Sequence, residues 1–125
     1  MNPAALAEPQ RTVIVVDDNP LNLELLRQDL EEAGYKTITA LSGSEALSAM
    51  QSVSPCLVLL DIMMPGISGL DVLREIRRAP ATRELPVILV SAKSESGDVV
   101  EGLRSGANDY VTKPIDIEVL LARKI

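Results

Sequence analysis

Four short segments of this sequence carry polar side chains that together could hold and transfer a phosphoryl group. Each follows an apolar stretch, and the four are the pair Asp17-Asp18, then Asp61, Ser91 and Lys113. Three carboxylates brought together repel one another, which raises their pKa values or requires a cation. Because the chain has no histidine and a single cysteine, oxygen ligands favour a hard ion, Mg²⁺ or alternatively Mn²⁺. A carboxylate nucleophile, a metal, an amine and a hydroxyl donor are the groups that phosphoryl transfer needs around one phosphorus.

Each of these residues alone has an ordinary structural explanation. The pair Asp17-Asp18 is typical of turns and caps, and Asp61 could simply end a strand in a turn. Ser91 by itself says little, and a lysine before a proline, as at Lys113, is usually a surface residue. The functional interpretation therefore depends on whether the fold brings all four segments to one place.

The elements that must position these residues alternate between short strands and helices. Apolar runs predict five strands, at residues 13–16, 37–39, 57–60, 87–90 and 110–111. The central runs are apolar at consecutive positions, which is typical of parallel strands buried on both faces. Helical spacing predicts helices at residues 20–33, 44–50, 70–76, 96–105 and from 117 onward. This alternation predicts an α/β fold with a parallel sheet, whose strands would bring their carboxyl ends to one ligand-binding edge.

Two of these helices carry local signals. Asn19 followed by Pro20 predicts the start of the first helix, and Gly34 predicts its end. Its buried stripe is expected at Leu21, Leu25, Leu26, Leu30 and Ala33. The helix at 96–105 contains Gly97 and Gly102, and each costs about 1 kcal/mol relative to alanine. We expect this helix to be the least stable by itself.

Composition limits the classes of function. With 125 residues and an apolar fraction of 46%, the chain is expected to form one domain over residues 11–125 behind a flexible leader at 1–10. The net charge of −6 argues against direct binding of nucleic acid. No apolar run approaches the roughly 20 residues of a membrane span, and no secretory signal is visible, so we expect a cytoplasmic protein. Cys56 is expected to be a small core residue.

The polar residues lie within four longer motifs. These are Val16-Asp17-Asp18-Asn19, the stretch 60–69 (LDIMMPGISG), Val90-Ser91-Ala92, and the stretch 106–114 (GANDYVTKP). They resemble the response-regulator receiver family of two-component phosphorelay systems, and the resemblance covers essentially everything after the leader. It implies a flavodoxin-like (βα)5 fold, with a five-stranded parallel sheet of order 2-1-3-4-5 and helices on both faces. Asn108, where an aspartate is common, is a small departure.

The resemblance implies a role for each acidic residue. Asp61 would be the phosphoacceptor. Asp18 and Asp61 would bind Mg²⁺ directly, together with the backbone carbonyl of Met63. Asp17 would act on the metal through a bound water.

The same resemblance implies how phosphorylation is read out. Ser91 and Lys113 would contact the phosphoryl group, and movement of Ser91 would free space for Tyr110, the switch aromatic. This would shift the face formed by residues 96–105, the strand at 110–111 and the helix from 117. A core tyrosine that stays buried in every state is the alternative for Tyr110. The family also makes Lys113-Pro114 a candidate for a cis peptide bond.

The implied function is that of a signalling phosphoacceptor and not of an enzyme with a separate substrate. Because the chain has no histidine, the phosphohistidine donor would be a sensor histidine kinase or a histidine phosphotransfer protein. The last predicted helix reaches the end of the sequence without a cap. We therefore expect it to be truncated, with a C-terminal effector domain or a partner protein as the output. A homodimer through the switching face is a further expected partner, and neither nucleic acid nor a membrane is expected.

Two other functions would use parts of the same pattern. A flavodoxin-like cofactor binder would stack its flavin on aromatic rings, but phenylalanine and tryptophan are both absent. An aspartyl-phosphate hydrolase would usually have a second acidic residue two positions after its nucleophile, where this chain has Met63. The sequence favours the phosphoacceptor over both.

Overall fold

Strands and helices alternate along the chain in the computed structural model, which describes residues 11–92 and 96–122. The strands are β1 (Thr12–Val16), β2 (Lys36–Ala40), β3 (Leu57–Asp61), β4 (Val87–Ser91) and β5 (Asp109–Thr112). The helices are α2 (Pro20–Glu32), α3 (Gly43–Ser52), α4 (Gly69–Arg78), α5 (Ser96–Arg104) and α6 (Ile117–Ala122). The expected leader at 1–10 and the last residues, 123–125, lie outside the described residues. None of the described helices has the length and apolar character that crossing a membrane requires.

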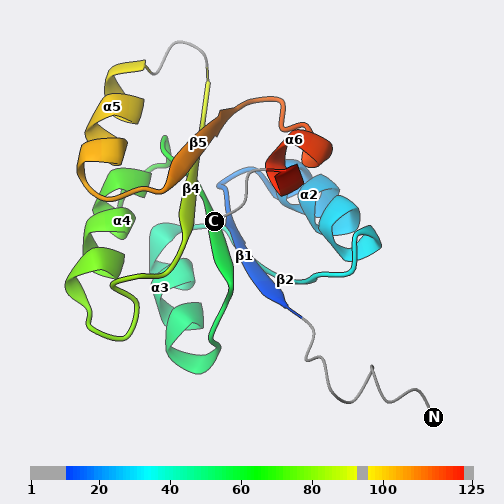
Figure 1. Cartoon of the computed structure of the whole chain (residues 1–125), viewed down its shortest axis with the longest axis horizontal. Coiled ribbons are helices and arrows are strands. Elements are labelled where there is room, and N and C mark those ends of the chain that lie inside the picture. Colours follow the sequence, from blue (N-terminus) through cyan, green and yellow to red (C-terminus); the bar gives the residue numbers. More distant parts are fainter. Residues whose placement is uncertain (1–10, 93–95, 123–125) are drawn as a thin grey trace.

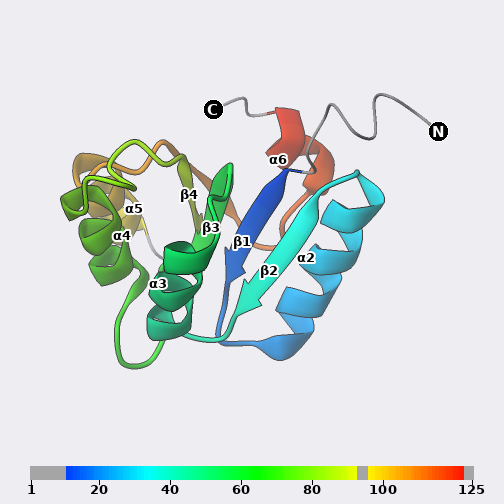
Figure 2. The ribbon, with the colours of Figure 1, turned by 90° about the horizontal axis from the view of Figure 1, so that it is seen from below.

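The strands form one parallel sheet in the order β2-β1-β3-β4-β5, which confirms the predicted fold class. Helices α3, α4 and α5 cover one face of the sheet, and α2 and α6 cover the other (Figures 1 and 2). The register pairs Val16 at the end of β1 with Leu60 on β3, and Ser91 at the end of β4 with Thr112 at the end of β5. The carboxyl ends of these strands therefore lie side by side.

Alternate residues of the central strands pack into two separate cores. On β1, Ile14 and Val16 belong to the core that includes residues of α3 and α4. Val13 and Val15 belong to the core that includes residues of α2 and α6. Both sides of the strand are thus buried, which explains why the sequence is apolar at consecutive positions.

Helix α2 begins and ends where its cap residues predict. The side chain of Asn19 accepts hydrogen bonds from the backbone N–H groups of Leu21 and Asn22, and Pro20 is the first helical residue. Gly34 adopts a φ of +99° just beyond the helix, a conformation that residues with a side chain rarely adopt. Both local predictions are confirmed.

The predicted buried stripe of α2 is right in part. Leu26 and Leu30 are buried as predicted, but Leu21 is 65% exposed, and Leu25 and Ala33 are also exposed. Leu23, which lies outside the predicted stripe, is buried in the core that includes residues of β1 and β3. The helix is rich in leucine, so two overlapping stripes have acceptable helical spacing. The angle at which the turn after β1 delivers the helix onto the sheet decides which of them is buried.

The expectation for Cys56 is also wrong, because its side chain is exposed. Cys56 lies just before β3, at the amino end of the sheet, where its backbone N–H donates to the carbonyl of Thr12 at 2.8 Å. Burial begins only at Val58 on the same strand. The cysteine therefore extends the strand pairing without entering the core.

The two glycines of α5 differ in their surroundings. Gly102 is buried, and a Cβ added there would lie 2.1 Å from Cδ1 of Leu89 on β4, so this glycine lets the helix approach the sheet. Gly97 is exposed, and a Cβ there would meet nothing within 4 Å. Gly97 therefore lowers the helix propensity of α5 without improving its packing.

Candidate functional site

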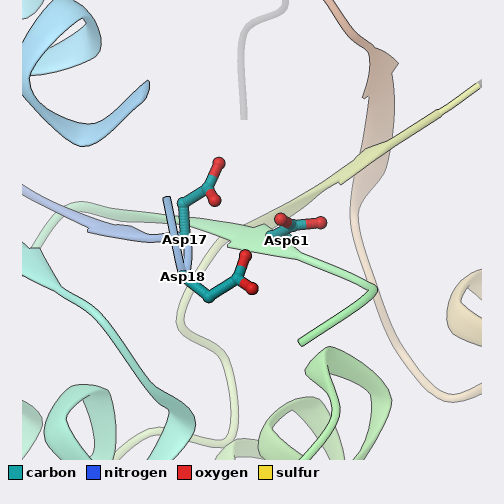
Figure 3. Close-up of side chains that lie close together, drawn as sticks. All are labelled: Asp17, Asp18 and Asp61. Atoms are coloured by element: carbon teal, nitrogen blue, oxygen red, sulfur yellow. The ribbon is translucent and has the colours of Figure 1, made fainter. Parts of the chain in front are cut away.

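The polar residues singled out in the sequence meet at the carboxyl ends of four strands. Asp17 follows β1, Asp61 ends β3, Ser91 ends β4 and Lys113 follows β5. Together with Asp18 they form what we call the carboxyl edge. Oxygen atoms of Asp17, Asp18 and Asp61 all lie within 4.8 Å of one another, and Figure 3 shows the three side chains gathered between β1 and β3.

Asp17 is held in a fixed orientation by the start of α2. Only 4% of the residue is exposed. Its Oδ1 accepts a hydrogen bond from the backbone N–H of Asn19 at 2.9 Å, and its Oδ2 accepts one from Nδ2 of Asn22 at 3.3 Å. Asp18, by contrast, is exposed. The two adjacent carboxylates therefore present one buried and one solvent-facing ligand.

Asp61 is the most enclosed of the three carboxylates, with 2% of the residue exposed. Its Oδ2 accepts a hydrogen bond from Nζ of Lys113 at 2.9 Å, and its Oδ1 accepts one from the backbone N–H of Met63 at 3.2 Å. Burial raises the pKa of Asp61 to about 6, and the charge of Asp17 adds to the rise, while Lys113 and Met63 oppose it. The group is ionised at neutral pH, but at a cost in free energy that a cation would reduce.

Lys113 is the positive charge of the site. Its Nζ lies 2.9 Å from Asp61 and 3.7 Å from Oδ2 of Asp17. The peptide bond between Lys113 and Pro114 is cis, as the sequence resemblance suggested. Among the residues that the structure describes, one ammonium group against three carboxylates leaves an excess of two negative charges.

These donors fit a divalent cation. Within the described part of the chain, the cluster offers carboxylate oxygens from Asp17, Asp18 and Asp61 and no histidine or cysteine ligand. Oxygen donors and excess negative charge match the preference of Mg²⁺ over softer metals.

The hydroxyl of Ser91 is buried but lacks a partner. Ser91 is 1% exposed, and its Oγ makes no hydrogen bond with the residues that the structure describes. A buried polar atom without a partner costs free energy, so it is a place where a ligand atom can be accommodated. Ser91 lies on β4, the strand next to the one that ends in Asp61, and on the same side of the site as Lys113.

A cavity of about 350 Å³ adjoins Ser91, and its lining includes none of the three carboxylates. Its lining includes Val99 and Leu103 of α5 and Tyr110 of β5. Tyr110 is 38% exposed. The alternative of a tyrosine buried in every state is therefore wrong for this structure.

Two residues that the sequence argument left without a role also position the site. Asn22 orients Asp17, as described above. Gly69, the first residue of α4, donates to the carbonyl of Ile62 at 2.9 Å, and a Cβ there would lie 2.1 Å from the carbonyl oxygen of Asp61. Gly69 was visible as part of a motif, but nothing in the sequence indicated that α4 approaches the backbone of Asp61 so closely.

A second groove opens beside the carboxylates. It has a volume of about 460 Å³ and lies between α2 and the segment after β5. Its walls include Leu25 and Leu26 on one side and Pro114 and Ile115 on the other, with Asp17 and Lys113 at the end near the site. The exposed Leu25 that the sequence placed in the core thus lines this groove.

Known proteins resemble this chain in both sequence and fold. A family model for the response regulator receiver domain matches residues 13–124. Response regulator PleD of Caulobacter vibrioides is 43% identical over 111 residues, which cover 89% of this chain and 24% of that protein. The DNA-binding response regulator MtrA of Mycolicibacterium smegmatis is 43% identical over 114 residues, or 91% of this chain and 49% of MtrA. The chain thus spans a quarter to a half of these relatives.

A shorter relative and two solved structures match the chain over nearly their whole length. Protein PilH of Pseudomonas aeruginosa is 38% identical over 109 residues, which cover 87% of this chain and 90% of PilH. The receiver domain of NtrX from Brucella abortus matches with a TM-score of 0.81 and 34% identity, over 88% of this chain and 92% of that one. The chemotaxis protein CheY4 of Vibrio cholerae matches with a TM-score of 0.85 and 26% identity, over 91% of this chain and 95% of that one. This chain belongs to the response regulator receiver domain family.

Proposed function

We propose that this domain accepts a phosphoryl group on Asp61 and uses it to control an output domain or a partner protein. The observation that carries the proposal is the joint placement of a buried carboxylate, its lysine partner and an unpartnered serine hydroxyl at one edge of the sheet. An oxygen of Asp61 attacks the phosphorus in line. The P–O bond to Asp61 forms as the P–N bond of a phosphohistidine breaks, and the imidazole leaves with the electron pair and takes up a proton.

The metal site assigned to this reaction uses the acidic residues of the carboxyl edge. Asp18, Asp61 and the backbone carbonyl of Met63 would bind Mg²⁺ or Mn²⁺ directly, and Asp17 would act through a water. When bound, the cation neutralises charge on the phosphoryl oxygens. Lys113 adds a second positive charge beside Asp61, which lowers the cost of bringing an anionic donor to three carboxylates.

The phosphoryl donor in this proposal is a sensor histidine kinase or a histidine phosphotransfer protein. A histidine is absent from the sequence, so the donor group comes from another molecule or from a further part of a longer protein. The groove between α2 and the segment after β5 supports a protein donor, because its apolar walls end at Asp17 and Lys113. A donor that buries an apolar surface there would bring its phosphohistidine to Asp61. We place this exchange in the cytoplasm.

The output follows from the state of Ser91. Once Asp61 carries a phosphoryl group, its oxygens offer the Ser91 hydroxyl the acceptor that it lacks. Movement of Ser91 toward them lets Tyr110 turn into the cavity beside α5, and this reshapes the face formed by α5, β5 and α6. That face would then engage an effector domain, a partner or a second copy of the domain.

The direct test is phosphorylation by a small acyl-phosphate donor with Mg²⁺, followed by intact-mass measurement. We expect full modification of the wild type and none of Asp61→Asn, which keeps the size of the side chain and removes the nucleophile. Glu84→Gln, at an exposed acidic residue between α4 and β4, serves as the control and should be modified as fully as the wild type. Equal modification of Asp61→Asn would refute the assignment of Asp61.

A second experiment tests Lys113 as the partner of the phosphoryl group and not of the metal. Lys113→Ala should bind Mg²⁺ as well as the wild type or somewhat better, because one competing positive charge is gone. Addition of beryllofluoride with Mg²⁺ should then shift the backbone amide signals of α5 and β5 far less than in the wild type. A normal response in this variant would make Lys113 a surface lysine without a role in switching.

A further inference from the structure

Asn22 stands at the point where α2 meets the acidic residues. It is the third residue of α2 after the cap residue Asn19. Side chains in a helix lean toward its amino end, and here that direction leads to Asp17. Nδ2 of Asn22 donates to Oδ2 of Asp17 at 3.3 Å, while the backbone N–H of Asn19 donates to the other oxygen. The first turn of α2 therefore engages both oxygens of one carboxylate.

Asp17 needs these partners because the fold shields it from water. The residue is 4% exposed, and a buried carboxylate is tolerated only when it is hydrogen-bonded or paired. Asp18, one position later, is exposed and accepts no side-chain hydrogen bond from the described residues. Asn22 thus orients Asp17, the carboxylate that is shielded from water.

The oxygen that Asn22 holds is also the one nearest to Lys113. Nζ of Lys113 lies 3.7 Å from Oδ2 of Asp17 and 2.9 Å from Oδ2 of Asp61. If the amide were removed, Oδ2 of Asp17 would lack its donor and attract Lys113 more strongly. Lys113 would then be drawn from Asp61 toward Asp17.

We propose that Asn22 is a positioning residue that keeps Asp17 oriented for the metal and leaves Lys113 to Asp61. This inference rests on the proposed function, because it concerns the same site. It assigns a task to a neutral side chain that belongs to neither the metal ligands nor the groups around the phosphoryl. Its effect passes entirely through Asp17, and that property makes it testable.

The experiment is a double-mutant cycle that combines Asn22→Ala with Asp17→Asn, read by titration calorimetry with Mg²⁺. Substitutions in the outer shell of a metal site lower affinity by about 10- to 100-fold, and we expect Asn22→Ala to fall at the lower end, about tenfold. In the Asp17→Asn background the same substitution should change affinity less than about twofold. Asn22→Gln, which retains the amide, should recover part of the loss. Gln28→Ala removes an exposed amide from the same helix and should leave affinity unchanged.

Thermal unfolding without metal gives a second reading of the same cycle. Asn22→Ala also changes helix propensity, but this contribution is equal in both backgrounds and cancels. We expect Asn22→Ala to lower the melting temperature by about 3 °C more in the wild-type background than in Asp17→Asn. Equal effects in the two backgrounds, or a wild-type Mg²⁺ affinity in Asn22→Ala, would overturn the proposal.

Phosphorylation of the same samples separates this inference from the proposed function. If the wild type takes up phosphate but Asn22→Ala shows no coupling to Asp17, the function stands and the positioning role fails. If the cycle shows coupling and the wild type takes up no phosphate, Asn22 positions Asp17 and the proposed phosphoacceptor role fails. A wild type that binds no Mg²⁺ overturns the role of Asn22 toward the metal.

Discussion

The polar groups at the two ends of strands β4 and β5 differ in how fully they are hydrogen-bonded. At the amino edge, formed by Leu85, Val87, Gly106 and Asn108, the side chain of Arg77 from α4 reaches over the ends of the strands. Its guanidinium makes five hydrogen bonds with described residues, to the carbonyls of Thr82, Arg83, Leu85 and Gly106 and to Oδ1 of Asn108. Oδ1 of Asn108 also accepts from the backbone N–H of Val87.

The carboxyl edge lacks this balance of donors and acceptors. Asp61 has a pKa raised to about 6, mainly by burial, and the Ser91 hydroxyl has no partner among the described residues. At the amino edge, a half-buried cation is matched by neutral acceptors. At the carboxyl edge, negative charge is in excess. The difference is consistent with the proposed function: the amino edge contributes stability, and the carboxyl edge keeps unfavourable groups where a cation and a phosphoryl group are proposed to bind.

The largest expected effect is on the amino edge. Arg77→Ala removes five hydrogen bonds, including those to the half-buried carbonyls of Thr82 and Leu85, and should lower the unfolding free energy by about 3 kcal/mol. Mg²⁺ affinity should stay within about twofold of the wild type, because the carboxyl edge lies at the other end of the strands. Urea denaturation and calorimetry measure the two quantities.

The neighbouring arginine is the control for this substitution. The side chain of Arg78 is 74% exposed and makes one ion pair, with Glu75. Arg78→Ala should therefore change stability by less than about 0.5 kcal/mol. An equal loss in both variants, or a large loss of metal affinity in Arg77→Ala, would break the distinction between the two edges.

The next effect concerns pH and the carboxyl edge. Burial and the charge of Asp17 raise the pKa of Asp61 from 3.8 to about 6. Between these values the folded state holds a proton that the unfolded state has lost, so stability falls as pH rises through this interval. We expect a fall of about 2 kcal/mol between pH 4 and about 7 without metal, attributable to Asp61.

The variant Asp61→Asn isolates this contribution. Its unfolding free energy should lack that fall, so the two stability curves diverge as pH drops below about 6. Added Mg²⁺ should stabilise the wild type most above pH 6, where the carboxylate is ionised and no proton competes with the metal. Parallel curves for wild type and variant would mean that the pKa of Asp61 is not raised in the folded protein.

A smaller effect distinguishes the two adjacent aspartates. Asp18→Ala should raise metal-free stability by about 0.5–1 kcal/mol, because it relieves repulsion and removes no hydrogen bond. Asp17→Ala should give no such gain, since it leaves the donors of Asn19 and Asn22 without an acceptor. Mg²⁺ affinity should fall more in Asp18→Ala than in Asp17→Ala, because only Asp18 is assigned as a direct ligand. The reverse order of affinities would require the ligand roles to be exchanged.

The smallest expected effect separates the two glycines of α5. Gly97→Ala should stabilise the protein by about 0.5–1 kcal/mol, because nothing lies near the added methyl group. Gly102→Ala should destabilise it, since the new Cβ would collide with Leu89. A stabilised α5 should also respond less to beryllofluoride, which amide chemical shifts can measure. A gain in both variants would show that α5 does not pack on β4 as described.

Residues that act through local rules were predictable from the sequence. Asn19, Pro20 and Gly34 bound the first helix because capping and positive φ depend on neighbouring backbone only. The strands followed from consecutive apolar residues, and their parallel alternation with helices placed Asp17, Asp61 and the other polar residues at one edge. The place of the site could thus be predicted before any coordinates, because the carboxyl ends of parallel strands lie at one edge of a sheet. The strand order itself came from the resemblance to the receiver family.

Choices between equivalent local patterns needed the tertiary structure. The leucines of α2 allow two stripes, and the angle of the helix on the sheet buried Leu23 while leaving Leu21 and Leu25 in solvent. Cys56 looked like the start of a buried run, but the sheet covers that run only from Val58 onward. In both cases the deciding contacts come from residues distant in sequence, which periodicity does not contain.

Contacts between residues that are distant in sequence show most clearly what the sequence alone could not predict. Arg77 and Gly106 are 29 residues apart, and Lys113 and Asp61 are 52 apart. By itself, the sequence determined which residue types could carry the chemistry and that the strand ends would bring them together. Only the packed structure decided which oxygen each donor meets, how deeply Asp61 is buried and which hydroxyl is left without a partner, because hydrogen bonding and desolvation depend on the full three-dimensional surroundings of each atom.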